Sequence, residues 1–316
     1  MYLKKKLNVL IVAKPWQGGL HQYYLNAFKR NDICVTKIVY TYPINIKDYI
    51  SYKLNKIIWL QKKIDYINTS NYDLGFFINN EEILNQIKNK NNFLYLTDKS
   101  DPKKIENSNI IKIFISDIGY VSKVNNRKKI IEELPFGFDP IIHKSWRSNI
   151  EKKPICSIIN SDSDRDKILE SLIKKKIKLD VYGNYFFRHK LYFKMPHMFY
   201  PSVNFLNQGK IYSQYSISLN IHANVLKNGT NMRTFEVSGY QLAQIVNYRP
   251  GLDRFFEPDK EILVFSNIDE CIYKFNKILK DKKKYKKIVD SSYKRAMSEH
   301  TYDARVKQIL FDHTKF

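Results

Sequence analysis

Short apolar runs recur along the first half of the chain, and polar or amphipathic stretches separate them. The first run, at 7–13, is rich in β-branched residues and is typical of a buried parallel strand. A loop containing Gly18 and Gly19 follows it, and the pattern at 20–29 predicts a helix. A strand, a glycine loop and a helix in this order are typical of an α/β domain of the nucleotide-binding type. Further strands are predicted at 33–40, 73–78, 92–97, 111–115 and 130–134, with helical stretches such as 81–90 between some of them.

A second α/β series begins after a turn-rich segment at 134–140 and a polar stretch at 143–153. Its predicted strands are 155–160, 177–182, 216–221, 242–247 and 262–265, its predicted helices are 164–175 and 231–241, and the pattern from 269 onward is helical almost to the end. The whole pattern therefore predicts an α/β protein of two doubly wound halves with a cleft between them.

Composition narrows the class of protein. A length of 316 residues suits two domains, and a hydrophobic fraction of 43% excludes general disorder. No apolar run approaches the roughly 18 residues of a membrane span. The basic start at 1–6 lacks the apolar region and cleavage site of a signal peptide. The three cysteines, Cys34, Cys156 and Cys271, form no CxxC pair, so we expect reduced thiols in a cytoplasmic protein rather than a zinc site or a disulfide framework.

The formal net charge of +23 is large for a chain of this length. A field of that size suits an anionic partner such as a membrane surface, a phosphorylated lipid or a nucleic acid. Abundant lysine, asparagine and isoleucine give a second explanation, which is compositional drift in an AT-rich genome. The basic residues are dispersed, and no recognised nucleic-acid module is present. The finer hypothesis on location is therefore a peripheral position at the inner membrane face.

The segment with the most chemical information is 228–239, which begins in a loop and continues as a predicted helix. Thr230 or Asn231 suits the N-cap, and the free N–H groups and positive dipole end of a helix suit a diphosphate. Arg233 and Glu236 are three residues apart and share one helical face. A cation near phosphate, with a carboxylate one turn deeper for the ribose hydroxyls, fits a nucleoside diphosphate. The alternative is an ordinary ion pair on a solvated helix.

Several segments in the second half resemble one family in their order and spacing. They are Ser-Leu-Asn-Ile-His at 218–222, Met-Arg-Thr-Phe-Glu at 232–236, Phe-Phe-Glu-Pro at 255–258 and His-Thr-Tyr-Asp-Ala-Arg at 300–305. Together they look like the CgeB-like (spore maturation protein-like) glycosyltransferases. The segment 134–140 looks like the family's interdomain segment, and the loop 161–165 looks like the one in which an arginine opens a helix. The resemblance is dense over 134–310.

The resemblance implies a GT-B fold, with two Rossmann-like domains facing a central cleft. The acceptor side would be 1–145, the nucleotide-sugar side 146–300, and the helix at 301–316 would pack back on the first domain. Glu236 would hold the donor ribose. Many retaining relatives carry an earlier glutamate, but this chain has Asn228 and Gly229 there. This departure argues against a retaining mechanism that uses the earlier glutamate, and we expect backbone amides of this loop to hold the sugar or phosphate instead.

Other side chains complete the expected site. The predicted donor-binding set is Gly18, Gly19, Arg165, Thr230, Asn231, Met232, Arg233 and Glu236, and the predicted catalytic set is Asp98, His222 and Arg233. Glycines permit close approach of a phosphate, Arg165 neutralises it, His222 ends a strand at the cleft, and Asp98 suits a base toward the acceptor. The alternatives are a tight turn, a surface ion pair, a structural histidine and a turn-capping aspartate, respectively.

The predicted function is transfer of a sugar, of the hexosyl type, from a UDP- or GDP-linked donor to a glycan, lipid-linked or other acceptor. Helix dipoles and cations can stabilise the departing diphosphate, so no metal and no cofactor are expected. The spacing of Asp162 and Asp164 suits a metal, but the adjoining Arg165 favours a phosphate-side loop. Two alternatives stay open, a nucleic-acid-binding or DNA-modifying protein and a non-catalytic GT-B scaffold.

Overall fold

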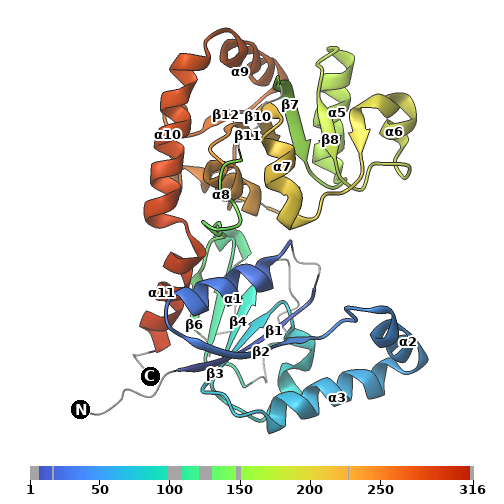
Figure 1. Cartoon of the computed structure of the whole chain (residues 1–316), viewed down its shortest axis with the longest axis vertical. Helices are drawn as coiled ribbons and strands as arrows, with labels where there is room; N and C mark the ends of the chain where they lie inside the picture. Colours follow the sequence, from blue (N-terminus) through green and yellow to red (C-terminus); the bar gives the residue numbers. More distant parts are fainter. Residues whose placement is uncertain are drawn as a thin grey trace. The chain divides into compact units, whose positions relative to one another are not determined.

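The chain divides into two compact units in a computed structural model that describes residues 7–15, 18–97, 105, 109–120, 130–146, 151–226 and 228–313 (Figure 1). Unit 1 consists of Met1–Pro135 together with Tyr302–Phe316, and unit 2 consists of Phe136–Thr301. The chain thus enters unit 2 after Pro135 and leaves it after Thr301, whereas the sequence pattern suggested divisions at 145/146 and 300/301.

Unit 1 is built on a parallel sheet with the strand order β2-β1-β3-β4-β5-β6. The strands are β1 (Asn8–Ala13), β2 (Cys34–Tyr40), β3 (Leu74–Ile78), β4 (Asn92–Leu96), β5 (Lys112–Ile115) and β6 (Ile130–Glu133). The helices are α1 (Leu20–Arg30), α2 (Ile46–Leu54), α3 (Lys56–Thr69) and α11 (Tyr302–His313), with short 3-10 helices η1 (Glu81–Gln86) and η3 (Ile118–Tyr120). Strands β3 and β4 are buried throughout, which explains their nearly continuous apolar sequences.

Two parts of unit 1 differ from a simple strand and helix pattern. The segment 41–72, where no strand was predicted, folds as the helical pair α2 and α3. The helix predicted at 81–90 is wrong beyond its first turns, because η1 ends at Gln86. Asparagine side chains compete for the backbone there: Asn89 Oδ1 accepts from the backbone N–H of Asn91 at 2.8 Å.

The last helix, α11, belongs to unit 1 although the whole of unit 2 precedes it in the chain. Its Tyr302 ring stacks on Tyr23 of α1, with 5.2 Å between ring centroids. Arg30 of α1 donates two hydrogen bonds, at 2.8 and 2.7 Å, to the carboxylate of Asp303. Arg305 donates to the carbonyl oxygen of Pro135 at 2.9 Å. These contacts attach the C-terminal helix to the first unit's own core.

Unit 2 repeats the plan with the strand order β12-β11-β10-β7-β8-β9, again all parallel. Its strands are β7 (Lys153–Ile158), β8 (Asp180–Tyr182), β9 (Phe199–Tyr200), β10 (Tyr215–Asn220), β11 (Ala243–Asn247) and β12 (Leu263–Phe265). Its α-helices are α5 (Ser163–Lys174), α6 (Lys190–Lys194), α7 (Gln208–Tyr212), α8 (Met232–Gly239), α9 (Ile268–Lys280) and α10 (Lys282–Glu299), with 3-10 helices η4 (Pro196–Met198), η5 (Phe205–Asn207) and η6 (Leu252–Arg254).

Each sheet has a point at which the chain reverses the direction in which strands are added. In unit 1 this point lies between β1 and β3, and in unit 2 it lies between β7 and β10. In open parallel sheets, ligands bind beyond the carboxyl ends of the strands at this switch point. The two-sheet α/β architecture expected from the sequence is confirmed. The switch point of unit 2 is therefore where a site is expected.

Candidate functional site

Two arginine side chains occupy the switch point of unit 2. Arg165, in the first turn of α5, donates from Nε to the carbonyl oxygen of Ile221 at 2.8 Å and from Nη1 to that of Asn160 at 3.2 Å. Arg233, in the first turn of α8, donates from Nε to the carbonyl oxygen of Ile158 at 3.3 Å. Burial lowers the pKa of Arg165; the charges of Asp162 and Asp166 oppose this shift, and the positive charge of Arg233 adds to it. Two mutually repelling cations at one strand edge favour an anion there.

The loop before α8 is held in place by its own side chains. Asn231 caps the helix, because its Oδ1 accepts from the backbone N–H of Thr234 at 3.1 Å. Asn231 and Asn220, at the end of β10, exchange two amide hydrogen bonds at 3.0 and 2.8 Å. The hydroxyls of Thr230 and Thr234 also contact each other, while Met232 is half-buried. These side chains hold the loop in one conformation. The backbone of the loop thereby lies beside the N-terminus of α8.

Glu236 is buried beneath Arg233, and its side chain has no exposed surface. Arg233 Nη1 donates to Glu236 Oε2 and also to Gln208 Oε1, the latter at 3.0 Å. Glu236 Oε1 makes no hydrogen bond within the described part of the chain, although His143 Nε2 lies 3.5 Å from it. A buried carboxylate oxygen without a hydrogen bond is costly, so this atom is a natural place for a ligand donor.

His143 is the site residue that sequence reasoning missed. Its ring is buried, and its Nδ1 accepts from the backbone N–H of Asp139 at 2.8 Å. The proton of the neutral ring therefore lies on Nε2, which faces Glu236. Burial lowers the pKa of His143 in spite of the opposing charges of Glu236 and Asp139. The signal that could have indicated His143 was its spacing of four residues from Asp139, at the edge of the segment interpreted as interdomain.

His222 follows β10 and is completely buried. Its backbone N–H donates to Asn247 Oδ1 at 2.6 Å, its Nδ1 lies 2.9 Å from the carbonyl oxygen of Asn247, and its Nε2 lies 2.8 Å from Thr230 Oγ1. Burial lowers the pKa of His222 to about 4, so the ring is neutral at pH 7. This geometry matches the alternative of a structural histidine, since one ring nitrogen contacts the end of β11 at Asn247 and the other contacts Thr230 in the loop before α8.

The predicted residues of unit 1 have different outcomes. Gly18 and Gly19 both have positive φ angles, of 59° and 88°, and Gly19 is the N-cap of α1. Glycine adopts this conformation without the clash of a Cβ atom, so the loop can turn tightly from β1 into α1. Asp98 lies outside the described residues. Asp117, a second aspartate at a strand end, accepts from the backbone N–H of Gly119 at 2.7 Å and so caps a turn.

The aspartate pair at the start of α5 serves the helix and a neighbouring loop. Asp162 Oδ1 accepts from the backbone N–H groups of Asp164 at 3.1 Å and Asn224 at 3.0 Å. Asp164 lies 3.7 Å from Arg249. The part of the chain that the structure describes contains no group of three or more histidine, cysteine, aspartate or glutamate side chains that could hold a metal ion.

Gly251 sets the position of the loop before α8. A Cβ atom at this position would overlap the carbonyl oxygen of Asn228. The backbone of 251 therefore packs directly on the loop that precedes the helix, which only glycine permits. The loop before α8 can therefore adopt this conformation only because residue 251 has no side chain.

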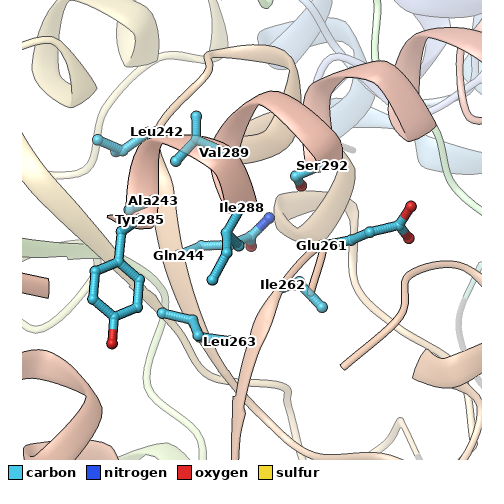
Figure 2. Close-up of a pocket in the computed structure, with 10 residues that line it drawn as sticks. All are labelled: Leu242, Ala243, Gln244, Glu261, Ile262, Leu263, Tyr285, Ile288, Val289 and Ser292. Atoms are coloured by element: carbon cyan, nitrogen blue, oxygen red, sulfur yellow. The ribbon is translucent and has the colours of Figure 1, made fainter. Parts of the chain in front are cut away.

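A small cavity lies between α10 and the segments that begin β11 and β12 (Figure 2). Its volume is about 10 Å³, room for one water molecule. It is lined by Leu242, Ala243, Gln244, Glu261, Ile262, Leu263, Tyr285, Ile288, Val289 and Ser292. Its strand residues are at the amino ends of β11 and β12, whereas ligands are expected beyond the carboxyl ends of the strands, so this cavity is not part of the candidate site.

Comparison with known proteins gives the class of this chain. Residues 165–311 match the family model described as "Glycosyl transferase-like". The chain is a glycosyltransferase of the GT-B fold. The match begins at Arg165, in the first turn of α5, and includes the loop before α8 and α8 itself, which carries Arg233 and Glu236. The narrower resemblance to the CgeB-like family stays a prediction.

Solved structures agree on the fold. Sucrose-phosphate synthase from Thermosynechococcus elongatus has a TM-score of 0.70 at 11% identity, covering 98% of this chain and 99% of that one. HepE from Anabaena in complex with UDP has a TM-score of 0.67 at 12% identity, covering 98% and 100%. T4 phage β-glucosyltransferase has a TM-score of 0.61 at 12% identity, covering 96% and 98%. No curated protein sequence matches the chain.

Proposed function

We propose that this glycosyltransferase moves a hexose from a nucleotide sugar, with UDP-linked donors ahead of GDP-linked ones, to a glycan or lipid-linked acceptor. The observation that carries the proposal is the placement of Arg165 and Arg233 at the switch point of unit 2, beside the N-terminus of α8 and the buried Glu236. UDP is the first choice of donor nucleotide because HepE has been solved with UDP and with UDP-glucose.

Donor binding would exchange partners within the Arg233 and Glu236 pair. The diphosphate would take the guanidinium of Arg233, which now bonds Glu236 Oε2. The ribose hydroxyls would then donate to Glu236, whose Oε1 has no hydrogen bond at present among the described residues. Each new hydrogen bond would involve at least one charged group, either the guanidinium and the diphosphate or the carboxylate of Glu236. Such charge-assisted hydrogen bonds are stronger than those between neutral groups.

Catalysis would rest on stabilising the charge of the departing diphosphate. Arg233 and Arg165 would supply cations, and the backbone amides of the loop that ends at Asn231 would add donors aligned with the dipole of α8. In this scheme Thr230, Asn231 and Met232 hold the loop, and His222 acts as a positioning residue behind it. We keep Asp98 as the proposed base toward the acceptor.

The decisive experiment is a thermal-shift screen with UDP-, GDP-, CMP- and dTDP-linked sugars, followed by calorimetry on variants. A ligand at about 100 times its dissociation constant stabilises the folded state by about 2.7 kcal/mol. Glu236→Ala should weaken nucleotide binding at least about tenfold, because hydrogen bonds to a charged group contribute about 1.5–3 kcal/mol. Glu236→Gln should be milder, and Arg233→Ala should lower turnover more than binding.

The matched control is Glu257→Ala. Glu257 and Lys260 form an ion pair with the same spacing of three residues, but both side chains are exposed. This variant should bind nucleotide like the parent. Equal binding by the parent and Glu236→Ala would make the Arg233 and Glu236 pair a purely structural one. A chain that no nucleotide sugar stabilises would instead be a non-catalytic scaffold.

The acceptor proposal has its own test. We propose that the charge of +23 places the enzyme at an anionic inner leaflet, where lipid-linked and surface glycans are assembled. The structure contains, among its described residues, no helix with the length and apolar character of a membrane span. Anionic lipid vesicles and duplex DNA should therefore be compared as partners at low salt. Binding to DNA alone would favour a DNA acceptor and leave the donor site unchanged.

A further inference from the structure

The helical pair α2 and α3 of unit 1 has apolar side chains on its outer surface. All residues of α2 are at least partly exposed, and Ile46, Ile50 and Leu54 follow one another at a spacing of four residues. That spacing places them on one side of the helix. Ile46 is 80% exposed and Leu54 is 81% exposed, and Ile57, at the start of α3, is 81% exposed. Figure 1 shows the two helices projecting from one side of unit 1.

The inner side of the pair is already occupied by aromatic rings. Tyr52 of α2 meets Trp59 of α3 edge to face, with 5.5 Å between centroids, and meets Tyr42 at 5.3 Å. Trp59 is buried. Helix α2 is thus attached through Tyr52, while its isoleucine and leucine side chains point elsewhere. A nine-residue helix is marginal alone, so an exposed apolar stripe on it implies a partner for that stripe.

We name Ile46, Ile50, Leu54, Ile57 and Ile58 the α2–α3 apolar face. Lysines are frequent in the same segment. Residues 44–70 contain five lysines, at 47, 53, 56, 62 and 63, against two aspartates, at 48 and 65, a net charge of +3. Three of these lysines lie over aromatic rings of the same helices, with the Nζ of Lys63 only 4.7 Å from the centre of Trp59. Aliphatic side chains flanked by lysine and aromatic residues are typical of helices that lie in a membrane interface.

We propose that the α2–α3 apolar face docks unit 1 on an anionic bilayer, with its aliphatic side chains among the acyl chains and its lysines at the lipid phosphates. Charge complementarity selects this partner. Two copies of the face would each bring +3 to a shared interface, and like charges oppose such a dimer. The inference rests on the proposed membrane location for the choice of partner and adds the surface that makes the contact.

The test is sedimentation with vesicles of phosphatidylglycerol mixed with phosphatidylcholine, and with vesicles of phosphatidylcholine alone. The variant Ile46→Ser, Ile50→Ser, Leu54→Ser should lose at least about 100-fold in partitioning to the mixed vesicles. Swapping Ile50→Leu and Leu54→Ile should retain the parent's binding. Lys47→Glu with Lys53→Glu should weaken binding at low salt and approach the parent at high salt.

The matched control is Leu206→Ser with Met297→Ser, two exposed apolar residues on separate elements of unit 2, η5 and α10. It should bind within about twofold of the parent, since single exposed apolar residues are ordinary. Loss of binding in this control, with the serine triple variant unaffected, overturns the assignment of the surface while leaving the membrane location intact. A parent that ignores mixed vesicles overturns both. A parent dimer that the serine triple variant converts to monomers shows a second copy on the face and also overturns the proposal.

Discussion

Helices α8 and α2 each depart from the usual pattern of a surface helix, in which apolar side chains are buried and polar side chains are exposed. Helix α8 buries polar side chains, including Thr234, Glu236 and Ser238. Helix α2 leaves Ile46 and Leu54 in contact with solvent. Buried polar groups and exposed apolar clusters are the informative departures from the hydrophobic rule, because each is costly without a compensating partner. Comparing the groups that contact α8 with those that contact α2 therefore distinguishes a ligand site from a docking surface.

The partners of the two helices differ in kind. Around α8 they are specific: Ser238 Oγ lies 2.7 Å from Ser292 Oγ and accepts from Gln244 Nε2 at 2.9 Å. Glu236 Oε1, a buried carboxylate oxygen of α8 itself, makes no hydrogen bond among the described residues and is left for a small donor such as a ribose hydroxyl. Around α2 the contacts are aromatic and confined to its inner side. An unbonded carboxylate oxygen in the interior suits a small ligand, whereas an apolar stripe suits an extended surface.

The largest effect on this comparison is expected from Arg233→Met. The change removes the cation and leaves Glu236 as a buried carboxylate with only neutral neighbours around it. Breaking a buried ion pair by removing one partner costs about 3–5 kcal/mol. Chemical unfolding of unit 2, followed by circular dichroism, should show this loss. Glu236→Gln in the Arg233→Met background removes the stranded charge and should recover most of it. A double variant as unstable as Arg233→Met would show that lost packing, and not the charge, is responsible.

The next effect concerns the loop before α8. Gly251→Ala forces a Cβ atom onto the carbonyl oxygen of Asn228 and should cost about 1–3 kcal/mol of stability. Because the same loop borders the proposed phosphate site, nucleotide affinity should fall as well. Calorimetry with UDP measures the second effect. A stable Gly251→Ala variant with the parent's affinity would exclude this loop from the donor site.

A smaller effect should follow from pH through His222. Above pH 6.5 the ring is neutral in the folded and the unfolded chain. As the pH falls below 6.5, the unfolded chain takes up a proton, whereas burial holds the pKa in the folded chain at about 4. Stability is therefore lost between pH 6.5 and about 4, and the loss from pH 6.5 to pH 5.5 is about 1 kcal/mol. Denaturant titrations at pH 6.5 and 5.5 should show this slope, and His222→Gln should reduce it.

The smallest effect is expected on α2. Ile50→Ser should change the free energy of unfolding in solution by less than about 0.5 kcal/mol, because the side chain is exposed. Val237→Ser, on the buried side of α8, provides the contrast and should be strongly destabilising. Thermal melts of both variants suffice. A large loss for Ile50→Ser would mean that unit 1 itself covers this residue in solution, and the contrast between the two helices would disappear.

Most strands of the fold were visible in the sequence. Buried parallel strands carry continuous apolar residues, and the predicted strands at 73–78 and 92–97 differ from β3 and β4 by a single residue at one end. Short elements between 184 and 212 gave no such pattern, because one or two turns contain too few residues to establish a period. The α2–α3 pair lacked a strand pattern and has apolar residues on two sides, which obscures helical amphipathicity.

The site was predictable where its residues are close in sequence. Arg233 and Glu236 share a helix, so their spacing alone placed them together. Arg165 could be assigned to a helix start but not to the carbonyl oxygen of Ile221, which is 56 residues away. His143 could not be connected with Glu236 at all, because the contact depends on the path of the segment that begins unit 2.

The sequence by itself therefore determined the α/β class, the positions of most strands along the chain and the helical face that carries Arg233 and Glu236, since these depend on local periodicity. Only the tertiary structure decided which strand ends meet at the switch point between β7 and β10, and that His222 and His143 lie in the interior. It alone also showed that the apolar residues of α2 remain at the surface. Burial and pairing across the sheet depend on contacts between residues far apart in the chain, which no local pattern records.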